Sequence, residues 1–184
     1  MQNCEELLEY IAAAQCSENY AGIGSRVYMG LRSDLSAPLT ETGPNWSGLT
    51  FKAGKGLYRL DCREEVNNIV GSSSNQNKGF TQTLNFTLDA VSPTTARVAR
   101  VLNNRKDLFF CVEDGDEIQI MYHPTNKIQV DSGGIETNTG AAAEDDRGVT
   151  CAIQLKKCKY PNNYLTLGDN QTLEGLCVTT DESD

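Results

Sequence analysis

One alternating stretch limits what this chain can fold into more than any other feature. Across residues 80–90, apolar side chains occupy the even positions, with Gln82 as the exception, and Thr, Asn or Asp occupy the odd ones. A period of two is that of a β-strand with one buried and one polar face, which is typical of antiparallel sheets. The sequence therefore predicts a β domain organised around this strand.

The residues after this strand predict a helix and then a hairpin. Ser92 suits a helix N-cap and Pro93 the first helical position, and the helix is expected to end near Asn103 and Asn104. Asp114 and Gly115 are a strong hairpin signal between two apolar stretches. Residues 108–112 are apolar on both faces, which predicts a strand covered on both sides, with the helix on one of them.

The remainder of the chain reads as shorter elements within one domain, residues 1–184. We expect an antiparallel β-sandwich or partly open barrel of the mainly β (α+β) class, with one packed helix after the central long strand and a short N-terminal helix. The expected segments are an N-terminal helical segment at 1–20, strands at 26–31, 49–52, 57–70, 128–130, 149–155, 164–167 and 173–178, loops at 33–48, 71–79 and 131–148, and an acidic flexible tail at 179–184.

Composition excludes several classes of function. The formal net charge is −9 and the pI is about 4.6, which disfavours binding to nucleic acid phosphates or to an anionic membrane surface. No apolar stretch approaches the ~20 residues that span a bilayer, and no signal peptide is expected. Seven irregularly spaced cysteines are typical of reduced thiols in a chain made in a cytoplasm.

No motif in the sequence predicts catalysis, a metal site or a cofactor. The single histidine, His123, could in principle activate Cys111, but that cysteine lies in an apolar strand where thiols are normally inert. The acidic groups at 113–117 and 144–146 lack the pattern of a calcium loop and are interpreted as solvated. Gly54, Lys55 and Gly56 fail the spacing of a phosphate-binding loop.

The order of these elements resembles the major tail proteins of long-tailed bacteriophages, which form the tail tube, and the related tube proteins of contractile tails and type VI secretion. The resemblance covers residues 51–155. It rests on twin strands across Gly54, an extended hairpin with a polar tip at 71–79, the helix that begins at Ser92 and Pro93, the hairpin at 109–122, and a glycine-rich turn through 145–148 that enters a late strand.

This resemblance implies a structural subunit whose copies, six to a ring, continue their β-sheets around a channel, with rings stacked into a tube. The implied partners are the chain itself and other phage tail proteins, with DNA passing without being bound and no membrane contact. The implied location is the virion tail, after synthesis in the cytoplasm of a bacterial host. A ring also pairs sheet edges that would otherwise promote aggregation.

Two sets of residues are candidates for roles in such a tube. The polar face of the long strand would line the channel, because it is neutral or acidic and offers no cation to phosphate; its members are Thr81, Thr83, Asn85, Thr87 and Asp89. The polar loop is the candidate contact between rings, with an ordinary mobile hairpin tip as its alternative; its members are Ser72, Ser73, Ser74, Asn75, Gln76, Asn77 and Lys78.

Other readings stay open at the level of sequence. The chain could be another tail or baseplate subunit, or a secretion-tube subunit. It could also be a β-sandwich binding module that recognises a ligand through Trp46 and the 131–148 loop, although an aromatic in such a loop more often covers the core. An enzyme is not expected.

Overall fold

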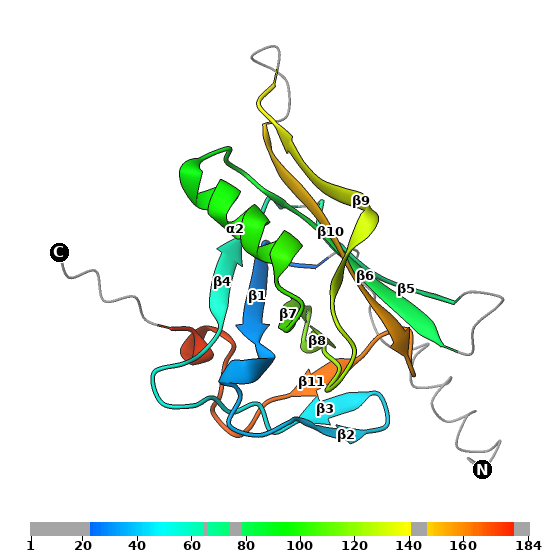
Figure 1. The fold of residues 1–184 in the computed structure, drawn as a ribbon. Helices are drawn as coiled ribbons and strands as arrows, with labels where there is room; N and C mark the ends of the chain where they lie inside the picture. Colours follow the sequence, from blue (N-terminus) through cyan, green and yellow to red (C-terminus); the bar gives the residue numbers. More distant parts are fainter. Residues whose placement is uncertain (1–22, 65, 74–78, 141–146, 179–184) are drawn as a thin grey trace.

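The computed structural model describes residues 23–64, 66–73, 79–140 and 147–178, and it contains two β-sheets and one α-helix in these ranges (Figure 1). The mainly β class predicted from the sequence is confirmed, as is the helix after the long central strand. The expected helical segment at 1–20 and the acidic tail at 179–184 lie outside the described residues.

The larger sheet has seven strands in the order β2-β3-β11-β8-β7-β1-β4. All of its pairs are antiparallel except β3 with β11. The strands are β1 (Arg26–Leu31), β2 (Thr40–Thr42), β3 (Asn45–Ser47), β4 (Tyr58–Asp61), β7 (Leu108–Asp114), β8 (Glu117–Met121) and β11 (Tyr164–Thr166).

The smaller sheet is a four-stranded antiparallel layer in the order β5-β6-β10-β9. Its strands are β5 (Asn68–Ser73), β6 (Phe80–Leu88), β9 (Gln129–Asn138) and β10 (Gly148–Cys158). Strand β6 has the predicted alternation, because Leu84, Phe86 and Leu88 are buried. Strands β9 and β10 extend together beyond the rest of the body (Figure 1).

Two apolar clusters lie on the two faces of the seven-stranded sheet. One fills the space between the sheets and includes Leu108, Phe110 and Val112 of β7 with Leu84 and Phe86 of β6. The other lies on the far face and includes Phe109 and Cys111 of β7. The prediction that β7 is covered twice is confirmed, but the second cover consists of loops and short strands; these contribute Leu35, Leu39, Trp46, Leu49, Leu57, Leu165 and Leu173.

Helix α2 (Pro93–Asn104) begins and ends where the sequence predicted. The Ser92 side chain accepts a hydrogen bond from the Thr95 backbone N–H at 3.2 Å, and the Thr95 hydroxyl accepts one from the Ser92 N–H at 2.9 Å. This reciprocal capping satisfies two N–H groups that a helix start leaves without partners. The helix buries Leu102 and contacts β9 and β10.

Several sequence predictions are wrong. Residues 49–52 do not form a strand, because only Phe51 makes an isolated bridge, to Leu35. Residues 57–70 are not one strand, because β4 ends at Asp61 and β5 begins at Asn68 in the other sheet. The 131–148 segment is not a continuous loop, because residues 131–138 belong to β9 and pair with β10. Residues 173–178 do not form a strand: they contain the 3-10 helix η2 (Glu174–Leu176) and one isolated bridge from Cys177 to Leu57. The predicted 33–48 loop contains the 3-10 helix η1 (Arg32–Asp34), β2 and β3, because this polar segment completes the seven-stranded sheet.

The buried cysteines predict a thiol-dependent loss of stability at alkaline pH. Burial raises the pKa of Cys62 and Cys151 to about 12 and of Cys158 to about 11, and it also raises the pKa of Cys111. In the unfolded chain a thiol ionises near pH 8.5. The folded state therefore keeps its full stability below about pH 8.5 and loses it as pH rises toward the folded values, which denaturant titrations at successive pH values will measure.

The same burial can be checked by chemical labelling. In a variant with Cys4 and Cys16 replaced by serine, we expect the half-buried Cys177 to react with a thiol reagent in the native protein, and the four buried thiols to react only after unfolding. Two or more fast-reacting thiols in the native state would contradict this packing.

Candidate functional site

Among the described strands, the sheet order leaves four with an open edge: β2 and β4 in the larger sheet, and β5 and β9 in the smaller one. An open edge presents unpaired backbone N–H and C=O groups, which can pair with a strand of another chain. Monomeric proteins protect such edges with charges, bulges, short strands or covering segments. The four edges of this chain differ sharply in this respect.

Three of the edges are protected. Strand β9 carries Asp131 and Glu136, contacts α2, and has a register shift against β10 close to Gly134, whose φ is 76°. Strand β4 carries Arg59, and at its start the backbone of Leu57 bonds to the 176–178 segment at 2.8 and 2.9 Å. Strand β2 has only three residues.

Among the described residues, strand β5 has neither charges nor a bulge, and its one covering contact is the backbone of Pro161, which lies against Gly71. Its sequence, Asn-Ile-Val-Gly-Ser-Ser, contains no charged residue and no proline, and its register with β6 is unbroken over six pairs. Val70 at its middle is 45% exposed. Only three large apolar side chains are classed as exposed in the described ranges, and the other two, Tyr58 and Val66, belong to β4 and to the β4–β5 connection. We identify the β5 edge as the best candidate interaction site.

The outer face of the four-stranded sheet carries most of the predicted channel residues. Thr81, Thr83, Asn85 and Thr87 alternate with the buried side chains of β6 and are half-buried. Their cross-strand partners include the apolar residues Val70 and Ala152. The Asn85 side-chain amide donates to the Asn68 side-chain oxygen at 2.8 Å, which ties this face to β5. Neither β5 nor β6 contains a charged residue.

Asp89 differs from the other candidates. It lies beyond the end of β6, and its carboxylate accepts a hydrogen bond from the Arg63 guanidinium at 2.8 Å. The structure thus brings four of the five predicted residues together on one strand face and places the fifth in an ion pair at its end.

The predicted contact loop is shorter than expected. Residues 71–73 belong to β5, where Ser72 pairs with Thr81 and Ser73 pairs with Phe80. A glycine and two serines can continue a strand here because β6 supplies the partner and an edge strand needs little apolar surface. Ser74, Asn75, Gln76, Asn77 and Lys78 lie outside the described residues.

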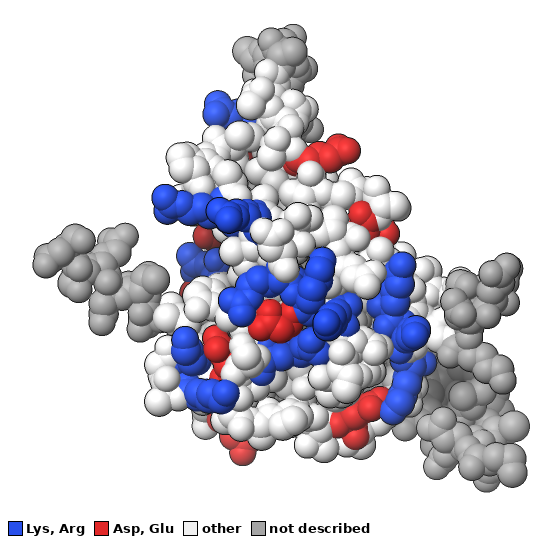
Figure 2. Space-filling view, in the orientation of Figure 1, with Lys and Arg blue, Asp and Glu red and all other residues white. Residues whose placement is uncertain are grey.

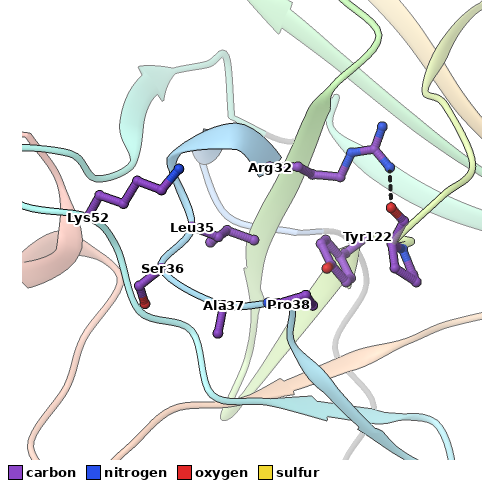
Figure 3. Close-up of a pocket in the computed structure, with 8 residues that line it drawn as sticks. Arg32, Leu35, Ser36, Ala37, Pro38, Lys52 and Tyr122 are labelled. Carbon is purple, nitrogen blue, oxygen red and sulfur yellow. Dashed lines mark hydrogen bonds between the residues drawn. The ribbon is translucent and has the colours of Figure 1, made fainter.

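A cavity of about 230 Å³ lies where β1 meets the loops of the far face (Figure 3). Arg32 and Lys52 line opposite sides of it, with Leu35, Pro38 and Tyr122 among the residues between them. The Arg32 guanidinium donates to the carbonyls of His123, Pro124 and Asn126 at 2.8, 3.0 and 3.1 Å, and the Lys52 ammonium donates to the Ser33 carbonyl at 2.7 Å. Both cations are thus engaged in holding loops together.

Cys111, His123 and Trp46, which the sequence offered as candidates for catalysis or ligand binding, contribute to packing and loop structure instead. Cys111 is fully buried, and the Nδ1 atom of His123 accepts hydrogen bonds from the backbone N–H groups of Thr125 and Asn126 at 3.1 and 3.0 Å. Trp46 is buried and its ring lies edge-on to Tyr122 with centroids 5.0 Å apart, so it does not offer a surface for stacking a ligand. This removes the main support for the binding-module reading.

Within the described ranges, no group of three or more His, Cys, Asp or Glu side chains is arranged to hold a metal ion. The helices within those ranges are too short or too polar to cross a bilayer.

Sequence reasoning missed the β5 edge and the role of Arg32. The edge depends on which strands pair in space, and the second half of β5, residues 71–73, was predicted to be part of a loop. The carbonyls that Arg32 contacts lie more than 70 positions away along the chain. The absence of charge from 68–73, beside a strongly periodic strand, was the one available signal for the edge.

Comparisons with known proteins found no relatives. No protein-family model matches the chain, and neither the curated proteins nor the solved structures gave a match.

A single added charge tests whether the β5 edge is an interaction site. Lysine at an edge opposes strand pairing, so Val70→Lys should reduce self-association at least about tenfold in sedimentation experiments while leaving the fold intact. Thr150→Lys is the matched control, because it adds the same cation to the same sheet on β10, whose two edges are already paired. Equal association of both variants and the parent would show that the edge is not used.

Proposed function

We propose that this chain is a structural subunit that assembles into rings and stacked tubes, of the kind that forms a bacteriophage tail tube in the virion. The observation that carries the proposal is the uncharged, unprotected β5 edge. A second copy can satisfy its backbone groups by adding a strand, and a closed ring of copies satisfies every such edge.

The outer face of the four-stranded sheet supports the same function. In a ring, the β5 edge of each copy would pair with a different edge strand of the next copy, and the polar face of the four-stranded sheet could line a channel. A wall for passing DNA must not bind phosphate, and the β5 and β6 part of the face meets that requirement because it carries no cation.

The distribution of charge refines this proposal. The described ranges contain 15 of the 16 basic residues but only 14 of the 25 acidic ones. The sandwich is therefore nearly neutral, and the excess of carboxylates belongs to segments outside it. We infer that the wall avoids DNA through its lack of cations, and that repulsion by carboxylates on β5 and β6 has no part in it.

The arrangement of elements is also in keeping with a tube subunit. The long strand β6, the capped helix α2, the β7–β8 hairpin and the late strand β10 follow one another as in the resemblance that suggested the family. In this proposal the partners are further copies, arranged six to a ring, and other tail proteins at the ends of the tube.

Electron microscopy of the concentrated protein tests the proposal directly. We expect rings or tubes of constant diameter that appear as concentration rises, because ring closure requires several copies. A protein that stays monomeric in sedimentation experiments at every concentration and salt condition would contradict it.

The channel lining has a separate test. Thr83→Lys combined with Asn85→Lys should slow or block genome release from virions by about tenfold or more, because lysine ammonium groups attract phosphate, while tubes still form. Thr40→Lys, on β2 of the other sheet, is the control. Unchanged infectivity of the double variant would show that these positions do not face the channel.

A further inference from the structure

Basic side chains gather on one face of the molecule, over α2 and the loops below it (Figure 2). Three lysines from segments that are distant in sequence have their backbones close together, namely Lys106, Lys127 and Lys156. Arg32 donates to the carbonyls of Lys106 and Asn126 at 3.4 and 3.1 Å, and the Asn126 side chain donates to the Lys156 carbonyl at 3.1 Å. The backbone at these three positions is therefore held together.

Within the described ranges, these cations are not neutralised by carboxylates. All three are exposed, as are Arg97 and Arg100 on α2. Among the described residues, none of these five has a carboxylate within 4.0 Å, and Asp107, the acidic residue beside Lys106, pairs with Arg105 at 3.1 Å. We call Arg97, Arg100, Lys106, Lys127 and Lys156 the basic face. Holding like charges together opposes folding, so an external anionic partner is the natural complement.

The chain carries such a complement at the other end of the same hairpin. The β7–β8 turn contains Glu113, Asp114, Asp116 and Glu117 and no cation, and all but Asp114 are exposed. Asp114 accepts a hydrogen bond from the Gln119 side chain. Arg26, a cation near this turn, forms an ion pair with Glu174, at 4.0 Å. We call these four residues the acidic turn.

The two charged regions lie at opposite ends of β7. Lys106 precedes the first residue of the strand by two positions, and Asp114 is its last residue. Seven residues at roughly 3.3 Å each separate the ends by about 20 Å, which exceeds the Debye length of about 8 Å at physiological salt. The two regions do not neutralise each other in one subunit, but they are placed to do so between two copies.

We propose that the acidic turn of one copy docks on the basic face of the next, so that copies join head to tail through complementary charge. This proposal rests on the proposed tube, in which it supplies the contact between stacked rings. A head-to-tail contact is heterologous and can repeat without limit, as stacking requires. Nucleic acid is a less favourable partner for the basic face than the acidic turn of another copy. The chain as a whole carries a net charge of −9 and repels a polyanion at long range.

Paired charge reversals test this contact. One variant reverses the basic face with Lys106→Glu, Lys127→Glu and Lys156→Glu. The other reverses the acidic turn with Glu113→Lys, Asp116→Lys and Glu117→Lys. All six positions are exposed, and circular dichroism with thermal unfolding will establish that both variants fold. Both are made in the Val70→Lys background, where pairing through β5 is blocked, so the head-to-tail contact is measured without ring formation.

We expect the parent Val70→Lys protein to associate in 50 mM salt and to lose this association at least about tenfold in 500 mM salt, measured by sedimentation. Each reversed variant alone should associate at least about tenfold more weakly than the parent. An equimolar mixture of the two should associate again, because one then offers two acidic ends and the other two basic ends.

Other outcomes overturn the proposal in distinguishable ways. If the acidic-turn variant associates like the parent, the turn is not the occupant of the basic face. If a 30-base-pair DNA duplex binds the parent in 150 mM salt and the basic-face variant loses only that binding, the occupant is nucleic acid. If chains that keep Val70 and carry only one of the two reversals still form rings that stack, the contact is refuted and the tube stands, whereas salt-sensitive association without any rings refutes the tube alone.

Discussion

The burial of β7 on both faces is the constraint on which the rest of the structure depends. Leu108, Phe110 and Val112 point into the cluster between the sheets, and Phe109 and Cys111 point into the cluster on the far face. A strand of this kind needs two covering layers. The four-stranded sheet provides one, and loops with short strands provide the other. Because the described residues cover only one face of the four-stranded sheet, its outer face and its β5 edge are the candidates for contact with partners.

The elements that the sequence predicted well are those whose signal is local. The alternation of β6, the Ser92 cap of α2 and the β7–β8 hairpin turn each depend on neighbouring residues, and each is present. Residues 131–138 of β9 were missed because an outer strand needs few apolar side chains, and their glycines and acidic residues read as a loop. The polar face of β6 could be predicted, because its alternation depends only on neighbouring residues. The β5 edge, the basic face and the acidic turn as its complement could not, because each depends on which distant segments meet in space.

The two proposed contacts differ in their physics. Pairing at β5 would join backbone groups on an uncharged strand, so salt should affect it little. The head-to-tail contact joins exposed charges and weakens as salt rises. The net charge of −9 for the whole chain does not reveal this difference between the contacts. The described residues are nearly neutral in sum, and they carry the basic face and the acidic turn at opposite ends of β7.

The separation of charge also affects how readily free subunits pair through the unprotected β5 edge. Two copies that meet side by side through β5 in the same orientation place basic beside basic and acidic beside acidic, which opposes the pairing. A copy that adds to the top of an existing ring meets opposite charge below it while its edge pairs with a neighbour. In the proposed tube, growth on a ring is therefore favoured over the start of a new one. Like-charge repulsion would then take the place of the lysines and bulges by which other proteins protect their edges.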